Sequence, residues 1–177
     1  MKEHKKHRIK LWAVRVILIA LIVLWMSTIF GFSAESGEQS QSLSDKITIR
    51  VVNILNADYD NMSIAQQREY FNTISFFVRK TGHFGEYAIL GILMVTFIMT
   101  FETIRNLRRI GMLPILITTL VGMIYAATDE IHQGFVDGRS PKVMDVCIDT
   151  AGSFVGAVFF VILWLLIFRR KKKSVGK

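Results

Sequence analysis

Two uninterrupted apolar stretches decide the fold of this chain: residues 11–32 read LWAVRVILIALIVLWMSTIFGF and residues 146–168 read VCIDTAGSFVGAVFFVILWLLIF. Each contains one charged residue, Arg15 in the first and Asp149 in the second, close to its start. A helix rises about 1.5 Å per residue, so roughly 20 apolar residues cross the ~30 Å hydrocarbon core of a bilayer. The chain is therefore predicted to be an integral membrane protein.

Two shorter apolar segments, 83–101 and 112–131, complete a set of spans. The second contains Pro114 near its start, where the missing N–H of proline costs least. We therefore predict an all-α fold, an integral membrane four-helix bundle. The hydrophobic content of 51% excludes a disordered chain, and the single cysteine, Cys147, excludes an intrachain disulfide.

The distribution of Lys and Arg predicts the orientation of the bundle. Basic residues concentrate in the segments 1–10, 102–111 and 169–177, and the formal net charge is +8. By the positive-inside rule, both termini are predicted to be cytoplasmic, in a multi-pass protein of the bacterial plasma membrane. No aromatic or base-reading residues accompany these charges, so no nucleic-acid partner is expected. The first span is expected to remain uncleaved, although a signal peptide is the alternative.

The long connection 33–82 is predicted to lie outside the cytoplasm. It begins with a Ser-, Glu- and Gln-rich stretch that we expect to be irregular, and then places Leu43, Ile47 and Val51 at helical spacing. A second helix is predicted from Ser63, because Gln66 follows three residues later as a capping box. Two such amphipathic helices would lie in the membrane interface or, alternatively, form a lid over a site.

Polar residues gather where three spans meet this outer face, which includes the short connection 132–144. His83, Glu86 and Tyr87 share one face of the second span, and Asp129 and Gln133 share one face of the third. Ionisable groups inside a membrane are costly unless they are paired or wet, so a shared site is expected. The candidate ligand-binding residues are Lys80, His83, Glu86, Tyr87, Asp129, Glu130, Gln133, Arg139, Asp145 and Asp149.

One face of the predicted fourth span, 145–168, carries two carboxylates and then two glycines. Asp145 and Asp149 are followed by Gly152 and Gly156 at helical spacing, and Gly91 on the second span also permits a close helix neighbour. These glycines are predicted to pack helices, within the chain or in a homo-oligomer. Lys80 and His83 are the expected partners of the two carboxylates, with Arg139 and Lys142 the nearest cations in sequence.

The same polar residues permit three interpretations. They could lock the bundle together, form a ligand pocket, or perform acid–base catalysis with His83 or Glu130. The candidate ligands follow no standard metal-site spacing, so neither a metal nor a cofactor is expected. A non-catalytic protein is the preferred hypothesis.

Two signatures resemble those of the VanZ-like family. The first is Lys80-x-x-His83-Phe84-x-x-Tyr87-x-x-Leu90-Gly91; the second is Asp129-Glu130-x-x-Gln133-x-Phe135, followed by Gly138-Arg139, Asp145, Gly152 and Gly156. The resemblance covers one domain, at about residues 9–168. Asp149 departs from the pattern, since many members carry Asn there.

The resemblance implies a small bacterial membrane protein linked to low-level resistance to the lipoglycopeptide teicoplanin. We therefore expect a polar pocket in the outer leaflet whose partners are membrane lipids, a lipoglycopeptide antibiotic or a cell-wall precursor. An enzyme that modifies an envelope lipid headgroup is one alternative. A structural or regulatory partner in a membrane complex is the other.

Overall fold

The computed structural model describes residues 2–102 and 112–174, with side chains over 8–102 and 112–167. Its elements in chain order are α1 (Lys2–Ala34), α2 (Gly37–Leu55), the 3₁₀ turn η1 (Tyr59–Asn61), α3 (Ile64–Ile98), α5 (Met112–Gln133) and α6 (Val143–Ser174). Within the described residues every regular element is a helix, and 4 helices, α1, α3, α5 and α6, are long and apolar enough to cross a membrane. The predicted all-α membrane bundle is confirmed. The predicted orientation depends on basic residues in 1–10, 102–111 and 169–177. Those of 1–7, 103–111 and 169–177 lie outside the residues whose side chains the structure describes.

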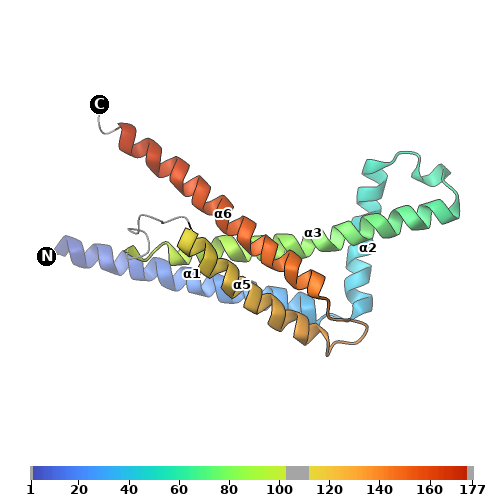
Figure 1. The fold of residues 1–177 in the computed structure, drawn as a ribbon, viewed down its shortest axis with the longest axis horizontal. Coiled ribbons are helices and arrows are strands. Elements are labelled where there is room, and N and C mark those ends of the chain that lie inside the picture. Colours follow the sequence, from blue (N-terminus) through green and yellow to red (C-terminus); the bar gives the residue numbers. More distant parts are fainter. Residues whose placement is uncertain (1, 103–111, 175–177) are drawn as a thin grey trace.

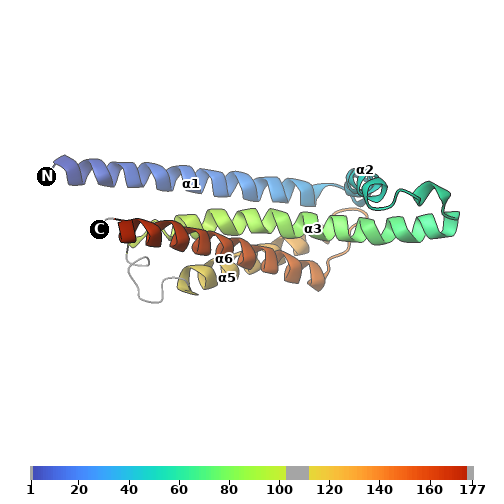
Figure 2. The same cartoon turned by 90° about the horizontal axis from the view of Figure 1, so that it is seen from above.

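Helix α3 is the centre of the bundle, because it contacts α1, α2, α5 and α6. Its most extensive contact is with α6. Helix α1 runs alongside α3, while α2 lies crosswise at the far end of the bundle, away from the start of α1 and the end of α6 (Figures 1 and 2). We call this far end, where α2 meets the connection between α5 and α6, the α2 end.

The first difference from the sequence prediction concerns α3. Ser63 caps the helix, and its side chain and that of Gln66 form the predicted capping box. The helix then continues through Lys80 and Gly82 to Ile98, so the predicted second amphipathic helix and the second span are one helix of 35 residues. No proline interrupts this stretch. A helical glycine such as Gly82 costs only about 1 kcal/mol, which packing against the neighbouring helices offsets.

The second difference concerns the start of α2. The stretch after Ser33 was expected to be irregular, but α2 begins at Gly37. The Ser36 hydroxyl accepts the backbone N–H of Gln39 (3.3 Å), and the Gln39 side chain accepts the N–H of Ser36 (3.2 Å). This second capping box supplies partners for backbone groups that a helix start leaves free.

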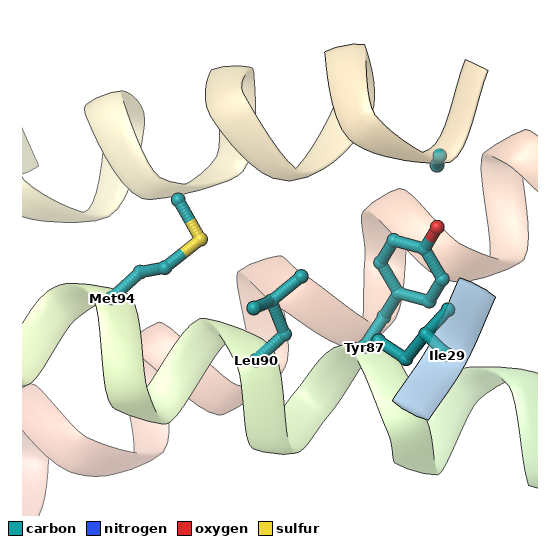
Figure 3. Packing of buried hydrophobic residues seen from close by; sticks show 5 residues of the cluster. Ile29, Tyr87, Leu90 and Met94 are labelled. Atoms are coloured by element: carbon teal, nitrogen blue, oxygen red, sulfur yellow. The ribbon is translucent and has the colours of Figure 1, made fainter. Parts of the chain in front are cut away.

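Two apolar clusters hold the spans together. At the α2 end, Ile29, Tyr87, Leu90 and Met94 pack with Ala126, which joins α1, α3 and α5 (Figure 3). At the other end, α3 and α6 share the second cluster, which consists of Val95, Met99, Ala157 and Val161. The long apolar faces that remain exposed, especially on α1, suit a hydrocarbon environment.

Small residues allow α3 and α6 to approach at backbone distance. A Cβ added at Gly152 would overlap the carbonyl of Phe84, and one added at Gly156 would overlap the carbonyl of Ala88. Gly91 of α3 lies equally close to the backbone of Ser153. The predicted packing glycines therefore lie at the contact between α3 and α6 of the same chain.

Side-chain hydrogen bonds tie α1 to this core. The Trp25 indole donates to the carbonyl of Glu86 (2.9 Å), and the Tyr125 hydroxyl donates to the carbonyl of Met26 (2.7 Å). Near the opposite end, the Arg15 guanidinium donates to the Thr100 hydroxyl (3.0 Å) and carbonyl (3.1 Å). It also lies over the ring of Phe101, 4.0 Å from the centroid. The one cation inside the first apolar stretch thus has partners at the end of α3.

We expect Gly156→Ala to lower the free energy of unfolding by about 1–3 kcal/mol, because the methyl group overpacks the contact with Ala88. Gly31→Ala is the matched control, since a Cβ there meets nothing within 4 Å and alanine favours a helix. Unfolding of the purified chain by SDS in mixed micelles, followed by circular dichroism, compares the two variants. Equal stabilities would contradict the close contact of α3 and α6.

Candidate functional site

The α2 end brings together side chains from four parts of the chain. Helix α3 contributes Lys80 and His83 near its middle, α5 contributes Gln133 at its last turn, and α6 contributes Asp145 at its first turn. Arg139 comes from the connection between α5 and α6. All five line one cavity of about 390 Å³.

Two contacts between a nitrogen-bearing side chain and a carboxylate join α3 to α6 beside this cavity. The Lys80 ammonium pairs with the Asp145 carboxylate, and both side chains are mostly buried. One turn further, His83 Nδ1 lies 3.5 Å from Oδ1 of Asp149, whose side chain is 1% exposed. Lys80 and His83 are thus the partners of the two carboxylates, as the sequence predicted. Each pair limits the cost of holding a carboxylate among apolar helices.

A buried hydrogen-bond chain lies behind the cavity. Asp129 Oδ2 accepts from the Ser33 hydroxyl (2.6 Å) and from the Gln133 amide (3.3 Å). The same amide lies 3.2 Å from the Ser33 oxygen, and its Oε1 accepts from Arg139 (3.3 Å). Ser33, Asp129 and Gln133 are each nearly inaccessible. The chain therefore links α1, α5 and the following connection.

Ser33 is a site residue that the sequence prediction missed. It belongs to a polar run just after the first apolar stretch, where serines are common and most face water. Only the α1–α5 contact puts its hydroxyl beside Asp129. No local spacing relates two residues so far apart in the chain, so no sequence signal identified it.

Arg139 is one of the two cations nearest in sequence to the carboxylates of the fourth span. Its described hydrogen bonds, however, go to carbonyls and an amide. Its guanidinium donates to the carbonyls of Phe32 (2.8 Å) and Glu35 (3.0 Å), as well as to Gln133. A helix leaves its last carbonyls without partners and carries partial negative charge there, so Arg139 acts as a cap for α1.

The predicted site residues therefore divide into two groups. Lys80, His83, Gln133, Arg139 and Asp145 line the large cavity, whereas Glu86 lines a smaller one of about 110 Å³ that also contacts His83 and Arg139. The others lie behind these linings and are buried: Tyr87, Asp129, Glu130 and Asp149.

The catalytic candidate Glu130 belongs to the buried group. Its Oε1 accepts the backbone N–H of Lys142, and its Oε2 is buried without a hydrogen bond. Oδ1 of Asp129 and the hydroxyl of Tyr87 are also buried without one. Of the two catalytic candidates, only His83 reaches the cavities. Among the residues that the structure describes, no group of three His, Cys, Asp or Glu side chains is arranged to hold a metal ion.

Helix α2 forms one wall of the large cavity. Its N-terminus is fixed by the Gly37 N–H, which donates to the carbonyl of Asp137 (3.0 Å). Gly37 and Gly138 are packed backbone to backbone, and Gly138 has a φ of +73°, which favours glycine. Further along α2, Gln41 accepts a hydrogen bond from Arg79 (2.6 Å). Leu43 and Ile47 then present apolar side chains to the cavity.

A family model described as VanZ/LLP1 matches residues 18–167. The chain belongs to the VanZ/LLP1 family. The match covers the second half of α1, all of α2, α3 and α5, and most of α6, so the cavity of the α2 end lies within the VanZ/LLP1 region. Comparison with curated proteins and with solved structures finds no match.

We expect Ser33→Ala to reduce the free energy of unfolding by about 1–3 kcal/mol, because it removes a donor from the buried Asp129 carboxylate. Ser27→Ala on the same helix is the control: its hydroxyl is exposed and donates to the carbonyl of Val23. SDS titration followed by circular dichroism measures both variants. If Ser33→Ala were as stable as Ser27→Ala, the buried chain would not contribute to the stability of the bundle.

Proposed function

We propose that this VanZ/LLP1 protein binds an amphiphile at the α2 end, either an envelope lipid or a lipoglycopeptide antibiotic, and thereby lowers susceptibility to teicoplanin. The binding is non-catalytic. The observation that supports it best is the cavity of about 390 Å³, which has charged and apolar linings and lies between α2, α3 and the connection that joins α5 to α6.

The composition of the lining suits a ligand with a polar head and an apolar tail. Lys80, His83 and Arg139 supply charged or polar groups, while Leu43 and Phe76 supply apolar ones. A polar group inside a cavity that is partly lined by apolar side chains gains more from a charge than it would in open water, because less water competes for the interaction. An apolar rim lets the rest of the ligand remain in the lipid phase.

The proposed orientation puts the α2 end in the outer leaflet of the bacterial plasma membrane. It rests on the excess of Lys and Arg in residues 1–10, 102–111 and 169–177. With both termini in the cytoplasm, the cavity would meet lipids and antibiotics from the outer side. Teicoplanin carries an acyl tail, which is the feature that an amphiphile site would recognise.

The alternative is an enzyme that modifies an envelope lipid headgroup. One observation favours it: His83 contacts both cavities and lies beside the buried Asp149. A carboxylate that orients an imidazole is a common arrangement for acid–base work. A role in a larger complex would need another surface than Gly152 and Gly156, because these glycines are occupied by α3.

Expression in a glycopeptide-sensitive Gram-positive host tests the proposal. Wild type is expected to raise the minimal inhibitory concentration of teicoplanin reproducibly, and that of vancomycin less, because vancomycin lacks the acyl tail. His83→Ala should lose the effect because it alters both cavities, whereas Ser27→Ala should keep it. Membrane levels are matched by immunoblot.

The same strains separate the two functions. No change in teicoplanin susceptibility with wild type would contradict the resistance proposal. A lipid species that accumulates in wild type and disappears with His83→Ala would favour the enzyme. Identical lipid profiles, together with a difference in susceptibility, would favour binding.

A further inference from the structure

The charge of the large cavity is unbalanced. Of the side chains that the structure describes, four cationic ones line it, those of Arg79, Lys80, Arg139 and Lys142, against the single carboxylate of Asp145. We propose that this cavity binds a phosphate group carried on a lipid headgroup, with Arg79 and Lys142 as its contacts. The inference rests on the proposed function, in which the cavity holds an amphiphile, and names the chemistry of its head.

The contacts of each cation show which ones are free for a ligand. Lys80 is neutralised by Asp145, and Arg139 is engaged by the end of α1 and Gln133. Arg79 has a neutral partner, the Gln41 amide oxygen, at 2.6 Å. The contacts of Lys142 in the described part of the chain are made by its backbone: its N–H donates to Glu130 and its carbonyl accepts from the N–H of Asp145. The positive charge of Arg79 and Lys142 is therefore not offset by a carboxylate.

A phosphate group suits these two side chains, because its several oxygens can accept hydrogen bonds from two directions at once. A guanidinium binds phosphate oxygens in pairs, and an ammonium adds a point charge from a second direction. Arg79 belongs to α3 and Lys142 precedes α6, so a phosphate that contacts both would bridge two elements of the bundle. Glu35 and Glu86 line only the smaller cavity, beyond Arg139.

The rim of the cavity indicates a lipid rather than free phosphate. Leu43, Ile47, Phe76 and Met144 line it and are each at least 42% exposed. Such side chains are costly in water and favourable beside acyl chains. A volume of about 390 Å³ accommodates a small headgroup rather than a whole lipid. The acyl chains of the lipid would extend out of the cavity along these apolar side chains.

Protection of a thiol in the cavity tests this assignment. Ser140 lines the cavity, so Ser140→Cys is combined with Cys147→Ser in the full chain, purified in dodecyl maltoside. The rate of maleimide labelling is measured while dioctanoyl phosphatidic acid, dioctanoylglycerol (the same lipid without phosphate) or inorganic phosphate is titrated. Phosphatidic acid is expected to protect the thiol at the lowest concentration, and inorganic phosphate to protect it least.

Charge removal at the two contacts supplies the decisive comparison. Arg79→Gln with Lys142→Gln is expected to weaken protection by phosphatidic acid about tenfold or more. Lys46→Gln is the control, because Lys46 is a cation of α2 that lines a different surface pocket. The targeted side chains are exposed, and circular dichroism verifies that each variant is folded.

The outcomes separate the two proposals. Equal protection by phosphatidic acid and dioctanoylglycerol, unaffected by the double substitution, would overturn the phosphate assignment and leave an amphiphile pocket. Equal protection by inorganic phosphate would overturn the lipid source. Protection by none of the probes would contradict both the phosphate assignment and amphiphile binding.

Discussion

The backbone contact of α3 with α6 determines the geometry of everything at the α2 end. Gly152 and Gly156 remove the side chains that would separate the helices, and the carbonyls of Phe84 and Ala88 occupy that space. Asp149 and Asp145 continue the same helical stripe toward the α2 end, about one turn apart. Because the two helices touch, His83 and Lys80 lie opposite these carboxylates. The register of the ion pairs thus follows from the register of the glycines.

A second set of contacts positions α1 and completes the lining. Arg139, in the connection between α5 and α6, donates to carbonyls at the end of α1. Ser33 of α1 donates to Asp129 of α5. These contacts bury polar groups that would be costly if unpaired in an apolar bundle. They also leave Arg139 at the boundary of both cavities. One residue therefore stabilises a helix end and shapes the site.

Sequence reasoning identified the spans, the cap at Ser63 and the pairing of Lys80 and His83, because each depends on local periodicity or on the cost of a charge in a membrane. It did not identify the continuity of α3, because the polar first part of this helix passes into the apolar second part without a break. It overlooked the capping box of Ser36 and Gln39, which lies in a polar stretch that was expected to be irregular. The roles of Ser33 and Arg139 depend on contacts between distant parts of the chain. Such contacts become visible only when the helices are placed together.

The unbroken length of α3 has a mechanical consequence. Its 35 residues extend over about 52 Å, roughly 20 Å more than a hydrocarbon core requires. The surplus carries Arg79 and the contact with α2 on the same rigid rod as the buried span (Figure 2). A helix tilts when bilayer thickness changes. Because the extension and the span are one helix, any tilt of the span also changes the direction of Arg79 and of the α2 contact, on one side of the cavity.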